Sequence, residues 1–254
     1  MKKIYLPVIF LAMFCMSSCV DVEEHYNFKS DGSCSVTYGF DMSKAVSVLV
    51  NLVSDSLKTS PQFSLVKDTT LNFYNAMPDS TQQKMSVAEV LMAKTSNLTI
   101  NMNLKKSIVK VTLNHTAKNA DDLKYYLQNV SKIALSSQIN AFATGGKNSH
   151  ALDAGQIVAG QDYYKYEITP HRFYRIIDKD KFNAFLRKTQ STFIMAKAML
   201  IDMPYKVILN FAKPIKKLHN SKAILSADKR SVILITNMDE VIKNPSLMNL
   251  RIDF

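Results

Sequence analysis

Residues 22–40 read VEEHYNFKSDGSCSVTYGF, and this stretch carries the clearest structural pattern in the chain. Alternate residues share one face in each half of it, Glu24-Tyr26-Phe28 and then Cys34-Val36-Tyr38-Phe40. A period of two residues indicates a β-strand. The dipeptide Asp31-Gly32 between the two halves is typical of a tight turn. The stretch therefore predicts an antiparallel hairpin near the start of the chain.

The order strand, turn, strand, helix recurs further along. After the hairpin, Asp41 or Ser43 is placed to cap a helix over residues 43–57, although the valines of this segment disfavour a helix. Alternation predicts strand pairs at 98–104 with 108–113 and at 163–168 with 173–177, followed by helices at 120–141 and 180–201. We expect four further strands, at 205–211, 223–226, 231–236 and 248–254, and short helices at 86–94 and 238–243.

This order of elements predicts an α+β fold, in which an antiparallel sheet built from hairpins has helices packed on one face. We expect residues 31–254 to form a single α+β domain with mobile loops near 58–85 and 142–161, where periodic segments are interrupted. Helix 180–201 is apolar enough to predict burial on more than one side.

The first nineteen residues, MKKIYLPVIFLAMFCMSSC, have the layout of a secretory signal. Two lysines precede an apolar stretch of thirteen residues, and small residues lead to Cys19. The segment Met16-Ser17-Ser18-Cys19 resembles the lipobox of bacterial lipoproteins, although Met16 stands where leucine is commoner. We therefore expect a lipoprotein signal peptide at 1–18, acylation of Cys19, and a lipidated N-terminus, short tether and first strand at 19–30.

Two alternatives to lipidation remain open. An uncleaved spanning helix is disfavoured by length, because thirteen residues rise about 20 Å against a bilayer core about 30 Å thick, and by Pro7. Ordinary secretory cleavage would instead leave Cys19 as a free thiol. Lipidation with palmitate-like chains would hold the body durably on a membrane, since two or more chains are needed for stable attachment.

An acidic run, Asp21, Glu23 and Glu24, follows Cys19 directly. Such a run resembles the export signal of surface lipoproteins in the Bacteroidota. The alternative is a solvated linker whose charges have no role. We expect the bacterial cell envelope as the location, with lipid anchoring in the outer membrane and exposure at the cell surface as a further option.

The chain has the composition of an ordinary globular protein, but its charge is unevenly distributed. The hydrophobic content of 47% and the charged content of 21% are ordinary for a globular protein. The formal net charge of +11 is uneven: residues 19–160 hold 13 Lys/Arg and 12 Asp/Glu, whereas residues 161–254 hold 17 and 9. This basic C-terminal half favours an anionic partner, such as lipid headgroups or acidic polysaccharide. The alternative is that these cations are ordinary solvated surface residues without a binding role.

The sequence contains no arrangement of residues that is typical of a catalytic site. The five histidines are scattered, and no metal-binding spacing or nucleophile elbow is present. Cys34 would need a histidine such as His25 to act as a nucleophile, and is better interpreted as a small strand residue. After signal removal only Cys19 and Cys34 remain, so no disulfide is expected once Cys19 is acylated. We expect no enzyme activity, no cofactor, no metal and no nucleic-acid partner.

Five basic residues near the end are the candidate contacts for an anionic ligand: Lys213, Lys216, Lys217, Lys229 and Arg230. If strands 205–211 and 223–226 lie side by side, these side chains gather at one end of the sheet. There they would bind a phosphate or carboxylate. The alternative is that they protect exposed strand ends against aggregation.

The two ends of the mature chain together resemble the LppM-like lipoprotein domain and its Bacteroidota relatives. The resemblance is carried by Asp31-Gly32-Ser33 behind the lipidated cysteine and, near the end, by Phe211-Ala212-Lys213-Pro214, Asn220-Ser221 and residues 228–233. It covers about 80 residues, and Cys34, Ile215 and Lys229 depart from the pattern. It implies a non-catalytic envelope domain with an apolar cavity for lipid or glycolipid.

Two functions are consistent with these features. The first is a membrane-anchored, non-enzymatic envelope lipoprotein that binds a lipid, a glycolipid or an anionic envelope component. The second is a structural or assembly subunit of a cell-surface protein complex, with an envelope protein as its partner.

Overall fold

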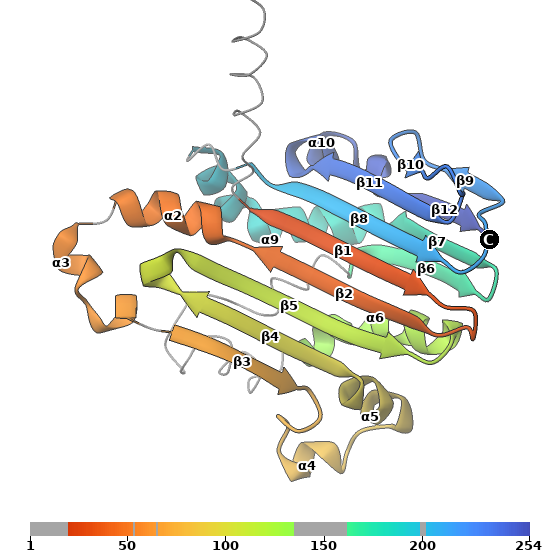
Figure 1. Ribbon diagram of the computed structural model, residues 1–254, viewed down its shortest axis with the longest axis horizontal. Coiled ribbons are helices and arrows are strands. Elements are labelled where there is room, and N and C mark those ends of the chain that lie inside the picture. Colours follow the sequence, from red (N-terminus) through yellow and green to blue (C-terminus); the bar gives the residue numbers. More distant parts are fainter. Residues whose placement is uncertain (1–19, 53, 65, 135–161, 199–201) are drawn as a thin grey trace, which may run out of the picture.

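The computed structural model describes residues 20–52, 54–64, 66–134, 162–198 and 202–254. It confirms the expected α+β class, with two β-sheets (Figure 1). The larger sheet has eight strands in the order β10 (Ile224–Leu225), β11 (Ser231–Asn237), β8 (Pro204–Phe211), β1 (Asp21–Phe28), β2 (Cys34–Asp41), β5 (Ile108–Ala117), β4 (Ser96–Asn103) and β3 (Val66–Asn72). The smaller sheet has four, in the order β6 (Tyr164–Thr169), β7 (Arg172–Ile177), β12 (Leu250–Asp253) and β9 (Lys217–His219).

The predicted first hairpin is confirmed as β1 and β2, with Phe28 opposite Cys34 at the turn. Its turn is closed by the backbone N–H of Lys29, which donates to the carbonyl of Ser33 at 2.9 Å. Gly32 has a φ of +85°, which a residue with a Cβ rarely adopts. The Asp31 carboxylate accepts hydrogen bonds from the backbone N–H and the hydroxyl of Ser33. The turn dipeptide therefore acts as the sequence predicts.

The expectation of one purely antiparallel sheet is wrong in two respects. Strands β1 and β8 pair in parallel, with Val22 opposite Tyr205 and Phe28 opposite Phe211. The third hairpin, β6 and β7, joins β12 and β9 in a separate sheet. Helix α9 (Lys179–Ala198) lies between β7 and β8 in the chain, and this long connection allows β8 to enter the large sheet beside β1 in the same direction.

Strands 205–211 and 223–226 do not lie side by side, because β11 is inserted between β8 and β10. β11 pairs with β8 over seven positions, and its inward residues Val232, Leu234 and Thr236 are buried. β10 has two residues and pairs only with β11. The longer strand with the more apolar inner face therefore takes the position next to β8.

Three further expectations need correction. Helix 43–57 is divided into α2 (Ser43–Leu52) and α3 (Asp55–Lys58). The segment 58–85, expected to be loop, contains η1 (Pro61–Ser64), strand β3 and α4 (Asp79–Gln82), and β3 pairs with the outer edge of β4. Helix α9 exposes Ile194 to 61%, so burial on more than one side is wrong at that position. Loop 142–161 lies outside the described residues.

The other helices lie close to their expected positions. They are α5 (Val87–Lys94), α6 (Ala120–Ala134) and α10 (Met238–Lys243), and the expected continuation of α6 to residue 141 lies outside the described residues. The short 3-10 helices η2 (Leu104–Lys106) and η4 (Pro245–Met248) were not predicted. α5 begins with a capping box formed by Ser86 and Glu89. On α6, the residues Leu123, Leu127 and Val130 are buried along one face, as the period of 3.6 residues predicts.

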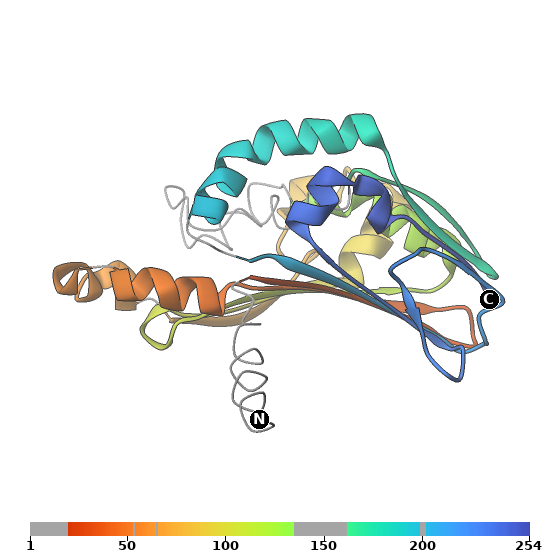
Figure 2. The same ribbon diagram turned by 90° about the horizontal axis from the view of Figure 1, so that it is seen from above.

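The smaller sheet and the helices α6, α9 and α10 cover one face of the large sheet (Figure 2). Aromatic rings fill the space between the sheets: Phe28 stacks on Phe211 with centroids 4.7 Å apart and contacts Phe173 at 5.6 Å and Phe254 at 5.4 Å. Tyr26 contacts Phe173 at 5.3 Å. These contacts form a packed core that joins both sheets.

Candidate functional site at the basic end of the sheets

The start of the described chain is fixed to the large sheet. Val20 is buried, and its backbone N–H donates to the carbonyl of Asp202 at 3.1 Å. Strand β1 begins at the next residue, Asp21. Cys19 and the signal at 1–18 lie outside the described residues. The expected tether between the lipidated cysteine and the first strand is therefore reduced to Val20.

The acidic run behind Cys19 is part of β1 rather than a solvated linker. Asp21 pairs with Lys44 at 3.7 Å. Glu23 accepts from His25 at 3.1 Å and from Lys206 at 3.2 Å, and these bonds lower the pKa of Glu23. Glu24 is buried and pairs with Arg175 at 2.7 Å. All three carboxylates thus have partners in the folded body.

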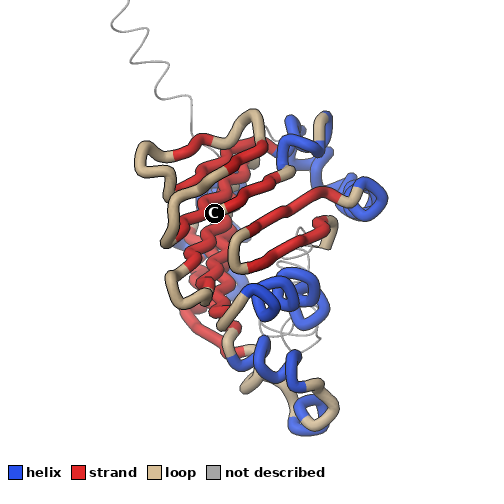
Figure 3. The backbone as a smooth tube through the Cα atoms, turned by 90° about the vertical axis from the view of Figure 1, so that its right-hand side faces the viewer, coloured by secondary structure: helices blue, strands red, loops and turns tan. Residues whose placement is uncertain are grey.

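The five basic candidates come together at the opposite end of β1. The residues lie in the β8–β9 loop, at the start of β9, and in the β10–β11 turn, and this end of the molecule faces the viewer in Figure 3. The backbone N–H of Ile215 donates to the carbonyl of Lys229 at 2.7 Å, and that of Lys216 donates to Asp253 at 2.7 Å. The N–H of Phe211 donates to the carbonyl of Arg230 at 2.8 Å. Backbone hydrogen bonds therefore hold the basic loops next to each other.

Lys213, Lys216, Lys217, Lys229 and Arg230 are all exposed. In the described ranges, none of these five side chains forms an ion pair with a carboxylate, although the Lys216 ammonium donates to the Phe254 carbonyl oxygen at 3.4 Å. Asp228 lies in the same turn, where it accepts from the Ser226 hydroxyl and from the Arg230 backbone N–H. These bonds lower the pKa of Asp228. We call the surface formed by the five cations, Lys213, Lys216, Lys217, Lys229 and Arg230, the basic end.

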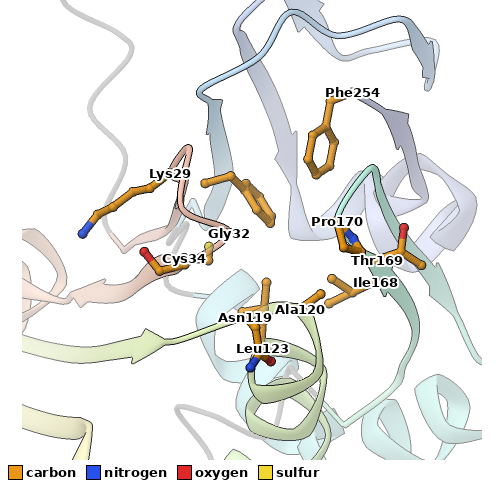
Figure 4. Close-up of a pocket in the computed structure, with 12 residues that line it drawn as sticks. Lys29, Gly32, Cys34, Asn119, Ala120, Leu123, Ile168, Thr169, Pro170 and Phe254 are labelled. Atoms are coloured by element: carbon orange, nitrogen blue, oxygen red, sulfur yellow. The ribbon is translucent and has the colours of Figure 1, made fainter.

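The end of the first hairpin borders this region. A small cavity of about 40 Å³ lies between the β1–β2 turn, the start of α6 and the β6–β7 turn, and its lining includes Phe28, Cys34, Leu123 and Phe254 (Figure 4). Burial raises the pKa of the Cys34 thiol to about 12, and Cys34 faces the core, whereas His25 faces the other side of the sheet. These residues do not form a nucleophile pair.

Sequence reasoning missed a buried polar cluster between the two sheets. The carboxylate of Glu24 on β1 accepts from Arg175 on β7 at 2.7 Å, from the Tyr26 hydroxyl at 2.6 Å, and from the Tyr205 hydroxyl. The guanidinium of Arg175 lies over the ring of Tyr164, 4.5 Å from its centroid. Burial opposes the charge of Arg175, but Tyr164 and Glu24 outweigh it and raise the pKa of Arg175. Glu24 and Arg175 are both fully buried.

A signal for this cluster was present in the alternation of the first hairpin. Glu24 occupies the same face as Tyr26 and Phe28, and a carboxylate on an inward face needs a buried partner. The partner itself was not evident, because Arg175 lies 151 residues away in the chain.

A second buried polar group lies under α5 and α6. The His115 Nδ1 atom is 2.9 Å from the Ser96 hydroxyl, and that hydroxyl donates to the carbonyl of Met92 at 2.7 Å. The imidazole stacks on the Tyr126 ring with centroids 3.8 Å apart. Burial lowers the pKa of His115 to about 3. A cavity of about 190 Å³ lies beside it, between α5 and α6, lined by Leu91, Asp121 and Tyr125 among others.

The two cavities are smaller than the ~300–1,000 Å³ of pockets for drug-sized ligands. Within the described ranges, no three His, Cys, Asp or Glu side chains are grouped so that they could hold a metal ion. None of the helices in those ranges is both long and apolar enough to cross a bilayer.

Comparison of the chain with protein-family models, with curated proteins and with solved structures gave no match. The candidate site is therefore the basic end, and it is identified from its residues alone.

Proposed function

We propose that the chain is a lipid-anchored, non-enzymatic envelope lipoprotein whose basic end binds an anionic component of the envelope. The observation that carries this proposal is the pairing of the β8–β9 loop and the end of β8 with the β10–β11 turn through the Ile215–Lys229 and Phe211–Arg230 backbone bonds, which gathers the five exposed cations. Clustered cations attract anionic ligands more strongly than scattered ones, because their potentials add.

The basic end lies far from the predicted anchor. β1 has eight residues, so its first and last Cα atoms are about 23 Å apart. Cys19 precedes the first of these residues, and the basic loops contact the last, where the backbone N–H of Ala212 donates to Phe28. A body whose strands stand upright on its membrane would present the cations away from that membrane. This arrangement favours an anionic polysaccharide or a phosphorylated glycolipid headgroup over an acyl chain held inside the body.

The resemblance to the LppM-like domain supports the same class of protein. The two chain ends that carry the resemblance are neighbours in the large sheet, because β1 pairs with β8 along its length. The implied apolar cavity has less support, since the described intersheet space is filled by aromatic rings and by the Glu24–Arg175 pair. We therefore place the ligand at the basic end.

Lipidation is tested by metabolic labelling of cells with a radioactive fatty acid. We expect the wild-type protein and the Cys34→Ser variant to be labelled and the Cys19→Ser variant to remain unlabelled, because the lipobox resemblance assigns acylation to Cys19 and the Cys34 thiol is buried. Equal absence of label from all three proteins would contradict the anchor.

Ligand binding is tested with a triple charge reversal, Lys213→Glu/Lys216→Glu/Lys217→Glu, on the lipidated protein. A basic residue near an anionic surface contributes about 1 kcal/mol, so we expect binding to lipopolysaccharide to weaken by about 100-fold. The matched control is Lys179→Glu/Lys181→Glu/Lys188→Glu, which changes the net charge equally at exposed positions of α9. The measurement is a binding titration at low and at raised salt, with an acidic polysaccharide as a second probe.

Equal weakening by both triple variants would show that net charge, and not the basic end, determines binding. If neither probe binds, and crosslinking in intact cells joins the wild type to one stoichiometric protein, the assembly-subunit function replaces this proposal.

A further inference from the structure

Helix α2 is strongly apolar, but most of it lies outside the core. Its sequence, SKAVSVLVNL, has six apolar residues in ten, and only Ala45 is buried. Val48 is 41% exposed, Leu49 is 39% exposed and Leu52 is 74% exposed. These three lie three or four residues apart around Leu52 and therefore share one helix face. An exposed, contiguous apolar face is typical of an interaction site.

The position of α2 connects it to the anchor. The Lys44 ammonium in its first turn pairs with Asp21 at 3.7 Å, and Asp21 is two residues from Cys19. The proposed anchor is therefore only two residues of chain away from a residue that contacts the start of α2. The ribbon shows α2 and α3 projecting past the end of the large sheet at which β1 begins (Figures 1 and 2).

A turn with two exposed lysines lies near the start of α2. The Ser43 hydroxyl at the start of α2 accepts from the backbone N–H of Val109, which follows the η2 turn. That turn carries Lys105 and Lys106, both exposed, and neither forms an ion pair with a residue that the structure describes. Val66, at the start of β3, is 62% exposed at the same end and pairs with Asn103. Exposed apolar residues beside unpaired lysines are typical of surfaces that lie in the interface of an anionic bilayer.

We infer that α2 lies in the headgroup region of the bilayer that holds the acyl chains of Cys19, with Val48, Leu49 and Leu52 inserted and Lys105 and Lys106 at the headgroups. This inference rests on the proposed lipid anchor. Ten residues of helix are about 15 Å long, so α2 lies in the interface and does not span the bilayer. The anchor raises the local concentration of α2 at the membrane, so that a weakly binding helix remains engaged. The anchor and α2 together would set the orientation in which the basic end is directed away from this membrane.

A fluorescent probe on a single introduced cysteine tests the insertion. The lipidated Leu52→Cys protein is labelled with a thiol-reactive, environment-sensitive dye and reconstituted into phosphatidylethanolamine–phosphatidylglycerol vesicles with or without nitroxide-bearing lipids. Cys34 is 1% exposed and does not compete for the dye, and Cys19 is acylated. The matched control is Val87→Cys, an apolar residue that is 87% exposed on α5, which leads into the start of β4 at the far end of the strands.

We expect nitroxide lipids to reduce the fluorescence at position 52 by about half, because an interfacial helix inserts ~5–10 Å into the headgroup and acyl boundary. The same lipids should leave the fluorescence at position 87 unchanged. Aqueous iodide should quench the probe at position 87 and spare the probe at position 52.

Two other results would overturn the inference. Equal iodide quenching at both positions, with the protein bound to vesicles, means that α2 stays in water. Protection of position 52 from iodide without quenching by nitroxide lipids means that a protein or a second copy covers α2. Failure of the protein to remain with the vesicles is a separate outcome, because it shows that the proposed anchor itself is absent.

Discussion

The Arg175→Met variant is expected to lose about 3–5 kcal/mol of its free energy of unfolding, the cost of leaving a buried charge without its partner. The substitution leaves the Glu24 carboxylate fully buried between the two sheets, with the hydroxyl donors of Tyr26 and Tyr205 but no cation. Methionine fills most of the volume of the arginine stem, so the lost stability reflects charge more than packing. The measurement is urea denaturation of the purified protein.

Two further variants separate this effect from general damage to β7. Arg172→Met makes the same substitution on the same strand, but Arg172 is 43% exposed and pairs with Glu167 and Asp253 at the surface. Exposed pairs contribute little, so we expect a loss of no more than about 1 kcal/mol. The double variant Glu24→Gln/Arg175→Met removes both charges and keeps an acceptor for the two tyrosines, and it should recover most of the stability. An Arg175→Met variant as stable as Arg172→Met would show that the buried pair has no structural role.

The first hairpin and the helix positions were predictable because they depend on local patterns. The alternation in residues 22–40 placed Tyr26, Phe28 and Cys34 on the inner face, and all three are buried. A turn dipeptide and a helical period act within a few residues, where sequence and structure are closely coupled. Helix ends were less accurate, as the division of residues 43–57 into α2 and α3 shows.

Long-range pairing was not predictable in the same way. β1 and β8 both alternate apolar and polar residues, and this pattern is compatible with several neighbours and with either direction. The position of β11 beside β8 could not be predicted in this way, because a choice between β10 and β11 as the neighbour of β8 requires the strand order of the sheet to be known first. The short strand β3 is polar on most of its surface, since it lies at a sheet edge, and it therefore resembled a loop.

In the candidate site, too, the local features were predictable from the sequence and the long-range contacts were not. Charge counting identified Lys213, Lys216 and Lys229 because a cluster of cations is visible in the sequence. The contact that brings them together is the backbone bond from Ile215 to Lys229, which no side-chain pattern predicts. Glu24 was assigned to an acidic signal behind the cysteine that is predicted to be lipidated, whereas in the structure it forms the buried pair with Arg175. The position of Glu24 on the inward face of a strand is therefore more informative than its place in an acidic run.

Acidification from pH 7.5 to pH 5 is expected to destabilise the protein through His115 by about 2 kcal/mol. In the unfolded chain a histidine has a pKa of about 6.5, whereas burial lowers the pKa of His115 to about 3 in the folded protein. The unfolded state therefore binds more protons below pH 6.5, and stability falls as the pH decreases from 6.5 towards 3. Each pH unit in this window costs up to about 1.4 kcal/mol.

The hydrogen bonds of His115 explain why protonation is unfavourable. The Ser96 hydroxyl donates its proton to the Met92 carbonyl, so His115 must donate from Nδ1 to the Ser96 oxygen. The added proton would enter at Nε2, which is buried and has no hydrogen-bond acceptor among the described residues. The stacked Tyr126 ring offers no anion there, since burial raises the pKa of its hydroxyl. The neutral imidazole with its proton on Nδ1 is therefore the stable form of His115 in the folded protein.

The His115→Asn variant isolates this contribution, because an asparagine amide retains a donor for Ser96 but does not titrate in this range. We expect the variant to be less stable than the wild type at pH 7.5 and to lose about 2 kcal/mol less on acidification to pH 5, measured by urea denaturation at both pH values. The matched control is His171→Asn, which makes the same substitution at an exposed histidine of the β6–β7 turn. Acidification that destabilises wild type and His115→Asn equally would mean that His115 takes up its proton in the folded state, and the packing of α5 and α6 over β5 would then have to admit a charge.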